Sequence, residues 1–229
     1  MRIVDVKAIP VSIPLDKPIR WGSFEVKEKG AILVRVYTDE GIEGVGEAGF
    51  STVFYPQIQP IIDEILKPLI VGRDPFDIGR LWDEMYRATH KWGRRGHERY
   101  ALSGVDIALW DIIGKACGKP VYKLLGGYQK RIRCYFAPSL KEPEIVAKEC
   151  EEAVERGFTA IKLRAGLGLK TDIEIMRIAR QVVGDDVDLM IDPNMAYDFK
   201  TALRMIREFE KYGVYWVEEP IRARSIEEY

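Results

Sequence analysis

Three short segments of the sequence combine an apolar run with charged or polar residues, and together they could support metal-dependent chemistry. The segments are IKLR at 161–164, IDPN at 191–194 and WVEEP at 216–220. Lys162 and Asp192 stand 30 residues apart, and Asp192 and Glu218 stand 26 apart. Two carboxylates that face a common point suggest a site for a hard, oxygen-ligated cation such as Mg²⁺.

The spacing of these segments is about the length of one βα unit in an eight-unit α/β barrel of roughly 250 residues. Side chains at the carboxyl ends of the parallel strands in such a barrel converge on one face, where its chemistry takes place. We therefore expect Lys162, Arg164, Asp192 and Glu218 to point into one mouth.

The pattern of elements after residue 126 supports a parallel strand–helix array. Strands are expected at 131–136, 158–164, 187–192 and 214–218, and the helices between them end at Gly157, Gly184 and Gly213. Strands that alternate with helices, with glycine just past each helix, are typical of parallel βαβ units. The alternative on periodicity alone is a doubly wound open sheet, but no Gly-x-Gly-x-x-Gly follows a strand.

The first part of the chain has a different pattern, which predicts an α+β domain over residues 1–125, before the partial barrel at 126–229. Alternating apolar residues predict strands at 3–13, 31–37 and 42–48. Apolar residues at helical spacing predict helices at 56–70, 75–90 and 100–117. Residues 18–22 are expected to form a loop. Its Arg20 and Trp21 would either contact substrate or be a solvated arginine and a packed tryptophan.

Composition narrows the class of protein. The chain has 229 residues, 47% of them hydrophobic, and a net charge of −1, which gives no electrostatic case for nucleic acid or an anionic membrane. No apolar run approaches the length of a membrane span, and the N-terminus lacks the apolar segment of a signal peptide. Cys117, Cys134 and Cys150 show no metal-type spacing, which favours reduced thiols in a cytoplasmic protein.

Two longer motifs give a family resemblance. The first runs ALSGVDIALWDIIGK at 101–115 and continues to the LLGG at 124–127, and the second joins Asp192-x-Asn194 to the VEEP at 217–220. Together they resemble the signatures of the enolase superfamily, within it the mandelate racemase and muconate lactonizing enzyme group. The resemblance covers nearly the whole chain.

This resemblance implies a fold, a cofactor and a reaction. The fold is an α+β capping domain followed by a modified (β/α)₈ barrel, of which this chain would carry the first four βα units. The resemblance implies Mg²⁺ held by three carboxylates, the first two being Asp192 and Glu218, with a small-molecule carboxylate as substrate. Loss of the α-proton would give an enolate that the cation stabilises. The resemblance also suggests a homo-oligomer.

The reaction we expect is dehydration of an acid sugar to a 2-keto-3-deoxy acid. The alternatives are a racemase, epimerase or cycloisomerase on the same scaffold, or a catalytically silent fragment that acts only through assembly. The family's usual base position corresponds to Arg164, and arginine is a poor general base because it stays protonated. We therefore expect Arg164 to hold a carboxylate or enolate oxygen, which favours dehydration over two-base racemisation.

Proton abstraction is then assigned to Lys162, whose pKa a neighbouring guanidinium would help to lower, or to a group outside this chain. Asn194 is expected to hydrogen-bond either a ligand or the neighbouring backbone. By the ordinary barrel count, four more βα units and the third metal ligand would follow Tyr229, in a protein of about 375 residues. We expect a longer natural sequence, a second chain that completes the barrel, or a fragment without catalysis.

Overall fold

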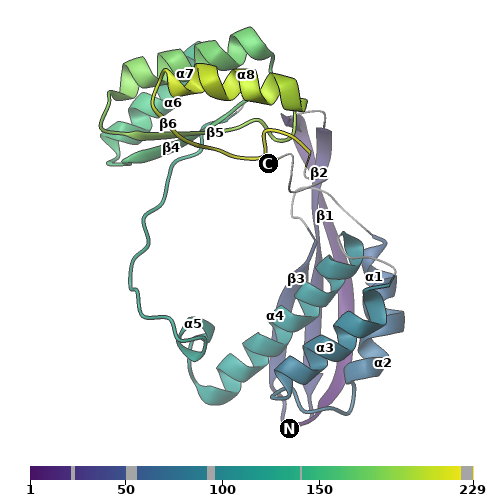
Figure 1. The fold of residues 1–229 in the computed structure, drawn as a ribbon. Coiled ribbons are helices and arrows are strands. Elements are labelled where there is room, and N and C mark those ends of the chain that lie inside the picture. Colours follow the sequence, from purple (N-terminus) through teal and green to yellow (C-terminus); the bar gives the residue numbers. More distant parts are fainter. Residues whose placement is uncertain (22–23, 50–55, 92–95, 140, 223–228) are drawn as a thin grey trace. The chain divides into compact units, whose positions relative to one another are not determined.

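The computed structural model describes residues 1–21, 24–49, 56–91, 96–139, 141–222 and 229, except for the side chains of residues 20, 21 and 24. The chain divides into two compact units (Figure 1). The first holds Met1–Pro18 and Val26–Lys130, and the second holds Ile19–Glu25 and Arg131–Tyr229. Among the described residues, no helix combines the length and the apolar character that crossing a membrane requires.

The first unit contains a three-stranded sheet in the order β1 (Ile3–Trp21), β2 (Phe24–Thr38) and β3 (Glu43–Ala48). Strands β2 and β3 are antiparallel, with Ile32 opposite Ala48. Because β1 continues to Trp21, the predicted loop at 18–22 is wrong for residues 18–21. Residues 11–14 of β1 are all exposed, so burial of one face does not define this part of the strand. Pairing with β2 sustains it instead.

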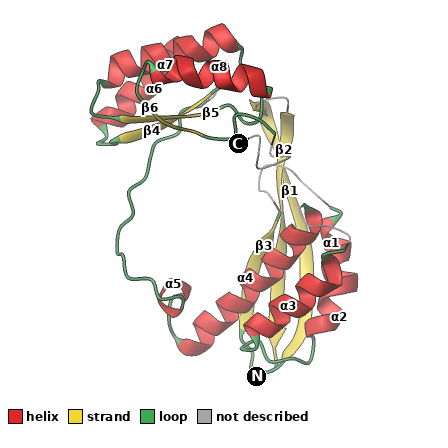
Figure 2. Ribbon diagram, in the orientation of Figure 1, coloured by secondary structure: helices red, strands yellow, loops and turns green. Residues whose placement is uncertain are grey.

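Helices cover one face of this sheet (Figure 2). A continuous helical stretch comprises α1 (Ile58–Pro60), the π-helix η1 (Ile61–Leu66) and α2 (Lys67–Ile70). It matches the helix predicted at 56–70 from residue 58 onward, whereas residues 56 and 57 form a turn. The others are α3 (Ile78–Thr89), α4 (His97–Cys117) and the short α5 (Val121–Leu124). Helix α4 approaches β3 so closely that a Cβ atom added to Gly46 would lie 2.0 Å from the carbonyl oxygen of Gly104.

The second unit is a parallel βα array. Its elements are α6 (Pro143–Glu155), β4 (Ala160–Arg164), α7 (Leu169–Val183), β5 (Asp188–Asp192), α8 (Phe199–Glu210) and β6 (Val214–Val217). Strands β4, β5 and β6 lie in that order and pair in parallel, with the three helices on one face (Figure 2). The predicted fold class, an α+β unit followed by part of a (β/α)₈ barrel, is confirmed.

Alternation along the strands divides their side chains between two faces of this sheet. Ile161, Leu163 and Ile191 are fully buried and belong to the apolar core that α6, α7 and α8 share with the sheet. Because successive side chains in a strand point to opposite faces, Lys162 and Asp192 lie on the face away from these helices. The helix-facing core thus fixes the direction of the charged side chains.

The strand predicted at 131–136 is wrong except at its last residue. Phe136 forms a single parallel bridge with Ile161, since its N–H donates to the Ala160 oxygen at 2.9 Å and its oxygen accepts from the Lys162 N–H at 2.8 Å. Ile132 is 82% exposed, and within the described residues the segment 131–135 has no pairing partner. Apolar residues there indicated a strand, but without a backbone pairing partner the segment remains irregular.

Candidate active site

The carboxyl ends of β4, β5 and β6 bring three charged side chains together. Lys162 Nζ donates to Asp192 Oδ2 at 3.0 Å and to Glu218 Oε2 at 2.9 Å. The side chains of Lys162 and Asp192 are 10% and 6% exposed, whereas that of Glu218 is 39% exposed. The two carboxylates therefore converge on one point, which the ammonium group of Lys162 occupies.

Backbone hydrogen bonds between the strand ends hold this arrangement. Arg164 lies opposite Asp192 in the parallel register of β4 and β5, and the Ala165 N–H donates to the Asp192 carbonyl at 3.0 Å. One strand further, the Glu218 N–H donates to the Ile191 carbonyl at 2.9 Å. The spacing of the three charged groups is consequently set by the sheet itself.

The charge balance of this cluster determines the protonation of Lys162. Burial lowers the pKa of Lys162, but hydrogen bonds to Glu218 and Asp192 raise it, and the net effect is a pKa above the ordinary lysine value. In this arrangement the two carboxylates raise the pKa of Lys162, and the lowering expected from a neighbouring guanidinium stays a prediction. In this arrangement Lys162 carries its proton.

Two aromatic rings adjoin the cluster. Lys162 Nζ lies 5.7 Å from the centre of the Tyr135 ring, and that ring meets Trp216 edge to face at 6.2 Å. A cation over a ring face is attracted by the ring's quadrupole. The aromatic pair therefore favours a positive charge at this point, as do the two carboxylates.

The backbone after β5 and β6 is strained. Asn194, Met195 and Glu219 have positive φ angles of 52°, 62° and 38°. Such conformations cost about 1–3 kcal/mol each and concentrate at functional sites. The Met195 N–H donates to the Glu219 carbonyl at 2.7 Å, so one strained turn holds the other in place.

The structure gives few side-chain contacts for the other residues that the sequence predicts to be in the site. Asn194 contacts Asp192 through its backbone, since its N–H donates to Asp192 Oδ1 at 2.9 Å. Arg164 is half-buried, and within the described part of the chain its side chain has no hydrogen bond or ion pair. Arg20 and Trp21 end strand β1, but their side chains lie outside the described residues. Substrate contacts of these residues stay predictions.

The donor chemistry fits part of a magnesium shell. Asp192 and Glu218 supply two hard oxygen ligands, and no cluster of three or more histidine, cysteine or acidic residues suited to a metal occurs among the described residues. Mg²⁺ commonly takes only one or two carboxylates, with water and substrate oxygens completing its octahedron. The two residues present are therefore compatible with Mg²⁺.

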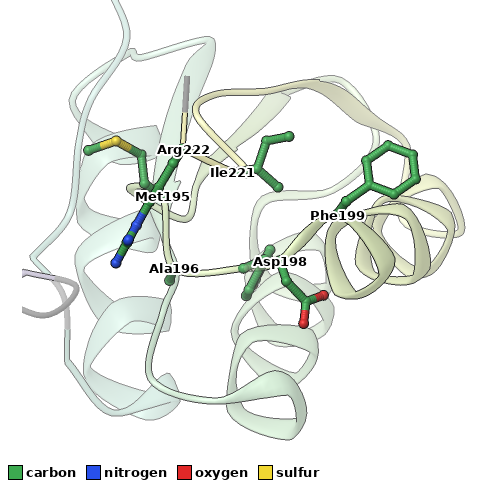
Figure 3. Close-up of a pocket in the computed structure, with 7 residues that line it drawn as sticks. Met195, Ala196, Asp198, Phe199, Ile221 and Arg222 are labelled. Carbon is green, nitrogen blue, oxygen red and sulfur yellow. The ribbon is translucent and has the colours of Figure 1, made fainter. Parts of the chain in front are cut away.

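An open cleft of about 510 Å³ lies between the loop after β5 and the segment after β6 (Figure 3). Met195 and Arg222 line one side, and Phe199, at the start of α8, lies on the other. Tyr197, in the same lining, is only 8% exposed, and its hydroxyl donates to the fully buried Asp172 at 2.8 Å. Sequence reasoning missed Asp172 and Tyr197. The only signal was a tyrosine five residues after Asp192.

Comparison with known proteins gives this geometry a family. The family model described as "Mandelate racemase / muconate lactonizing enzyme, N-terminal domain" matches residues 3–126, and the one described as "Enolase C-terminal domain-like" matches residues 145–229. The arabinonate dehydratase of Saccharolobus solfataricus is 41% identical over 200 residues, which cover 84% of this chain and 52% of that protein. The D-galactarolactone cycloisomerase of Agrobacterium fabrum is 31% identical over 235 residues, covering 100% and 61%.

A solved structure gives the same result for the fold. A racemase from Streptomyces coelicolor with bound magnesium superimposes with a TM-score of 0.88 at 28% identity, covering 97% of this chain and 64% of that one. The chain thus spans about half to three fifths of the length of the curated relatives it matches. Both family models and the strand-end cluster agree, and the chain belongs to the mandelate racemase and muconate lactonizing enzyme group of the enolase superfamily.

Proposed function

We propose that this protein removes the α-proton of a small carboxylate substrate with the help of Mg²⁺. The observation that carries the proposal is the convergence of two carboxylates from neighbouring parallel strands on one point. The Asp192 and Glu218 oxygens lie 3.0 and 2.9 Å from the ammonium nitrogen of Lys162. The relative solved with bound magnesium supports the choice of ion.

Each residue of the cluster has a role that follows from its charge. Asp192 and Glu218 hold the ion, which when bound would act as a Lewis acid toward the substrate carboxylate. Arg164, with its donors unpaired among the described side chains, binds a substrate or enolate oxygen through its planar fork. Lys162 Nζ donates to both carboxylates while no metal is bound, so its ammonium group neutralises them until the ion takes its place.

The contacts of Lys162 bear on which group accepts the α-proton. A base must be neutral or anionic when it accepts the proton, and the contacts of Lys162 oppose the neutral amine. A metal held by both carboxylates would remove these contacts, so the base is either Lys162 in the metal-loaded site or a group outside this chain, the two possibilities that the sequence leaves open.

Dehydration is the reaction favoured for this site. The α-carbon of a 2,3-dihydroxy acid loses its proton, the electron pair forms a C2–C3 double bond, and the C3 hydroxyl leaves with a proton as water. The resulting enol tautomerises to a 2-keto-3-deoxy acid. The 41% identity to an arabinonate dehydratase supports an acid sugar as the substrate. Cycloisomerisation is the second candidate, supported by the 31% identical relative of that name.

The test uses the protein as its own cells produce it, incubated with Mg²⁺ and a panel of aldonates that begins with arabinonate. We expect a 2-keto acid that disappears when the metal is chelated, and we expect Asp192→Asn to abolish both turnover and Mg²⁺ binding. Exchange of the α-proton with deuterated water without a keto product would indicate an isomerase. If the protein shows no turnover and no Mg²⁺ binding at saturating metal, the proposal is contradicted and the silent-fragment alternative remains.

Arg164 provides a sharper test of the dehydratase assignment. Arg164→Lys keeps the charge but removes the bidentate fork, so we expect kcat to fall about tenfold or more while the Mg²⁺ dissociation constant stays within about twofold. Steady-state kinetics at saturating Mg²⁺ measure the first quantity, and calorimetric titration measures the second. Unchanged turnover would mean that the guanidinium has no special role.

A further inference from the structure

A buried carboxylate outside the cluster of Lys162, Asp192 and Glu218 organises the loop that follows β4. Asp172 lies in the first turn of α7 and is 0% exposed. Its Oδ1 accepts hydrogen bonds from the backbone N–H groups of Gly166 and Leu167 at 3.0 and 3.1 Å, and its Oδ2 accepts one from the Tyr197 hydroxyl at 2.8 Å. These three donors satisfy a group that is costly to bury without partners.

The loop held by Asp172 has little conformational preference of its own. It begins directly after Arg164 and contains Gly166 and Gly168, whose φ angles of 105° and 129° are ones that residues with side chains rarely adopt. Glycine gives such a loop many alternative conformations. The two bonds to Asp172 Oδ1 select one of them, and with it the direction in which the chain leaves β4.

Tyr197 connects this loop to the other two strand ends. It belongs to the loop after β5, its hydroxyl reaches Asp172 beside the loop after β4, and its backbone N–H donates to the Pro220 carbonyl after β6 at 3.2 Å. Its side chain is buried, so solvent does not compete for the hydroxyl. Tyr197 therefore links the loop after β5 directly to the segment after β6, and to the loop after β4 through Asp172.

We propose that Asp172 and Tyr197 form a positioning pair that fixes the relative placement of the three strand ends and thereby the geometry of the metal and substrate site. Neither residue contacts the reacting groups in this role. The inference rests on the proposed function, because a metal or substrate must bind for the placement to matter. Partners that orient the groups around a metal commonly contribute 10- to 100-fold to its affinity or to activity.

The experiment compares three variants with the wild type, each as the full natural protein. Tyr197→Phe removes only the hydroxyl and leaves Asp172 Oδ2 without its donor, so we expect the Mg²⁺ dissociation constant to rise about tenfold and kcat to fall by a similar factor. Asp172→Asn can keep all three bonds, since its amide nitrogen can donate to the tyrosine oxygen. We expect its Mg²⁺ dissociation constant to stay within about twofold of wild type.

The matched control is Ile175→Val. Ile175 lies three residues further along α7 and is 1% exposed, so the change destabilises the same helix without removing any of the hydrogen bonds made by Asp172 or Tyr197. Thermal unfolding and titration with Mg²⁺ alone are measured for every variant. The inference predicts that Ile175→Val lowers the unfolding temperature and leaves the Mg²⁺ dissociation constant unchanged, whereas Tyr197→Phe changes both.

Two results would overturn the inference while leaving the proposed function intact. One is a Tyr197→Phe variant with wild-type Mg²⁺ affinity and turnover, whatever its stability. The other is an equal loss of affinity in Ile175→Val, which would make the effect one of general stability. A wild-type protein that neither binds Mg²⁺ nor turns over an acid sugar would overturn both the proposed function and the positioning role.

Discussion

Replacement of Lys162 by methionine tests the charge balance of the strand-end cluster. Lys162 neutralises Asp192 at 3.0 Å and Glu218 at 2.9 Å, and methionine retains much of its apolar stem without the charge. Removing one partner of a buried ion pair costs about 3–5 kcal/mol because it leaves an uncompensated charge. Glu218, at 39% exposure, can turn to solvent, whereas Asp192, at 6%, cannot.

Only one carboxylate is therefore left buried without a counter-charge. We expect the lower end of this range of about 3–5 kcal/mol, a loss of about 3 kcal/mol in the free energy of unfolding when the metal is chelated. A bound divalent cation would supply the charge that the ammonium supplies in the wild type. With saturating Mg²⁺ the difference between wild type and variant should narrow to about 1 kcal/mol or less. Urea unfolding at neutral pH, with chelator and with Mg²⁺, measures both differences.

The control is Lys211→Met, which removes an ammonium 2.6 Å from Glu208 at an exposed position on the helix surface. Exposed pairs contribute about 0.2–1 kcal/mol, so this variant should lose little in either buffer. Two results would refute the reasoning for Lys162. A loss no greater than that of Lys211→Met would show that the cluster charges are not buried in solution, and equal losses with and without Mg²⁺ would show that the metal does not bind there.

Two further predictions concern stability away from the cluster. Gly46→Ala should lower the free energy of unfolding by about 2 kcal/mol or more, because the added Cβ would lie 2.0 Å from the Gly104 carbonyl oxygen of α4. Gly79→Ala, whose added Cβ would have nothing within 4 Å, should leave the free energy of unfolding unchanged or raise it by up to about 1 kcal/mol. Urea unfolding would contradict this prediction if the two variants behaved alike. Asp198 caps α8 by accepting from the Thr201 N–H at 2.7 Å, and that bond lowers the pKa of Asp198. The stability it contributes is thus present above about pH 4, the ordinary aspartate range, and lost as the pH falls through the lowered pKa. Asp198→Asn should therefore be less stable than wild type by a constant amount above about pH 4, and the two stabilities should converge as the pH falls below it; a difference that stays constant below about pH 4 would contradict this.

The strand ends were predictable because local pattern and topology act together there. An apolar strand that ends in charge, repeated about every 28 residues, leaves few arrangements other than parallel strands with their carboxyl ends at one edge. The convergence of Lys162, Asp192 and Glu218 follows from that edge and from side-chain alternation. Neither step requires knowledge of contacts between distant residues beyond the sheet pairing.

The features that escaped prediction depend on long-range contacts. Asp172 has the appearance of an ordinary acidic residue in the first turn of a helix, and its burial depends on Tyr197, 25 residues later. Phe136 pairs with β4, but the residues before it have no backbone pairing with the described strands, so their apolar character was misleading. The extension of β1 to Trp21 likewise rests on pairing with β2 and not on burial.

The two oxygens of Asp192 have separate partners, and this has a consequence for how a cation would enter. Oδ1 accepts from the Asn194 N–H at 2.9 Å, inside the strained turn after β5, while Oδ2 accepts from Lys162. A backbone bond in a rigid turn is harder to exchange than a bond to a flexible lysine. Under the proposed function Asp192 and Glu218 would hold the ion, and these are the same two carboxylates that Lys162 Nζ now contacts. Binding of a metal there would therefore compete with the ammonium group for both carboxylates and would release Lys162 Nζ from them.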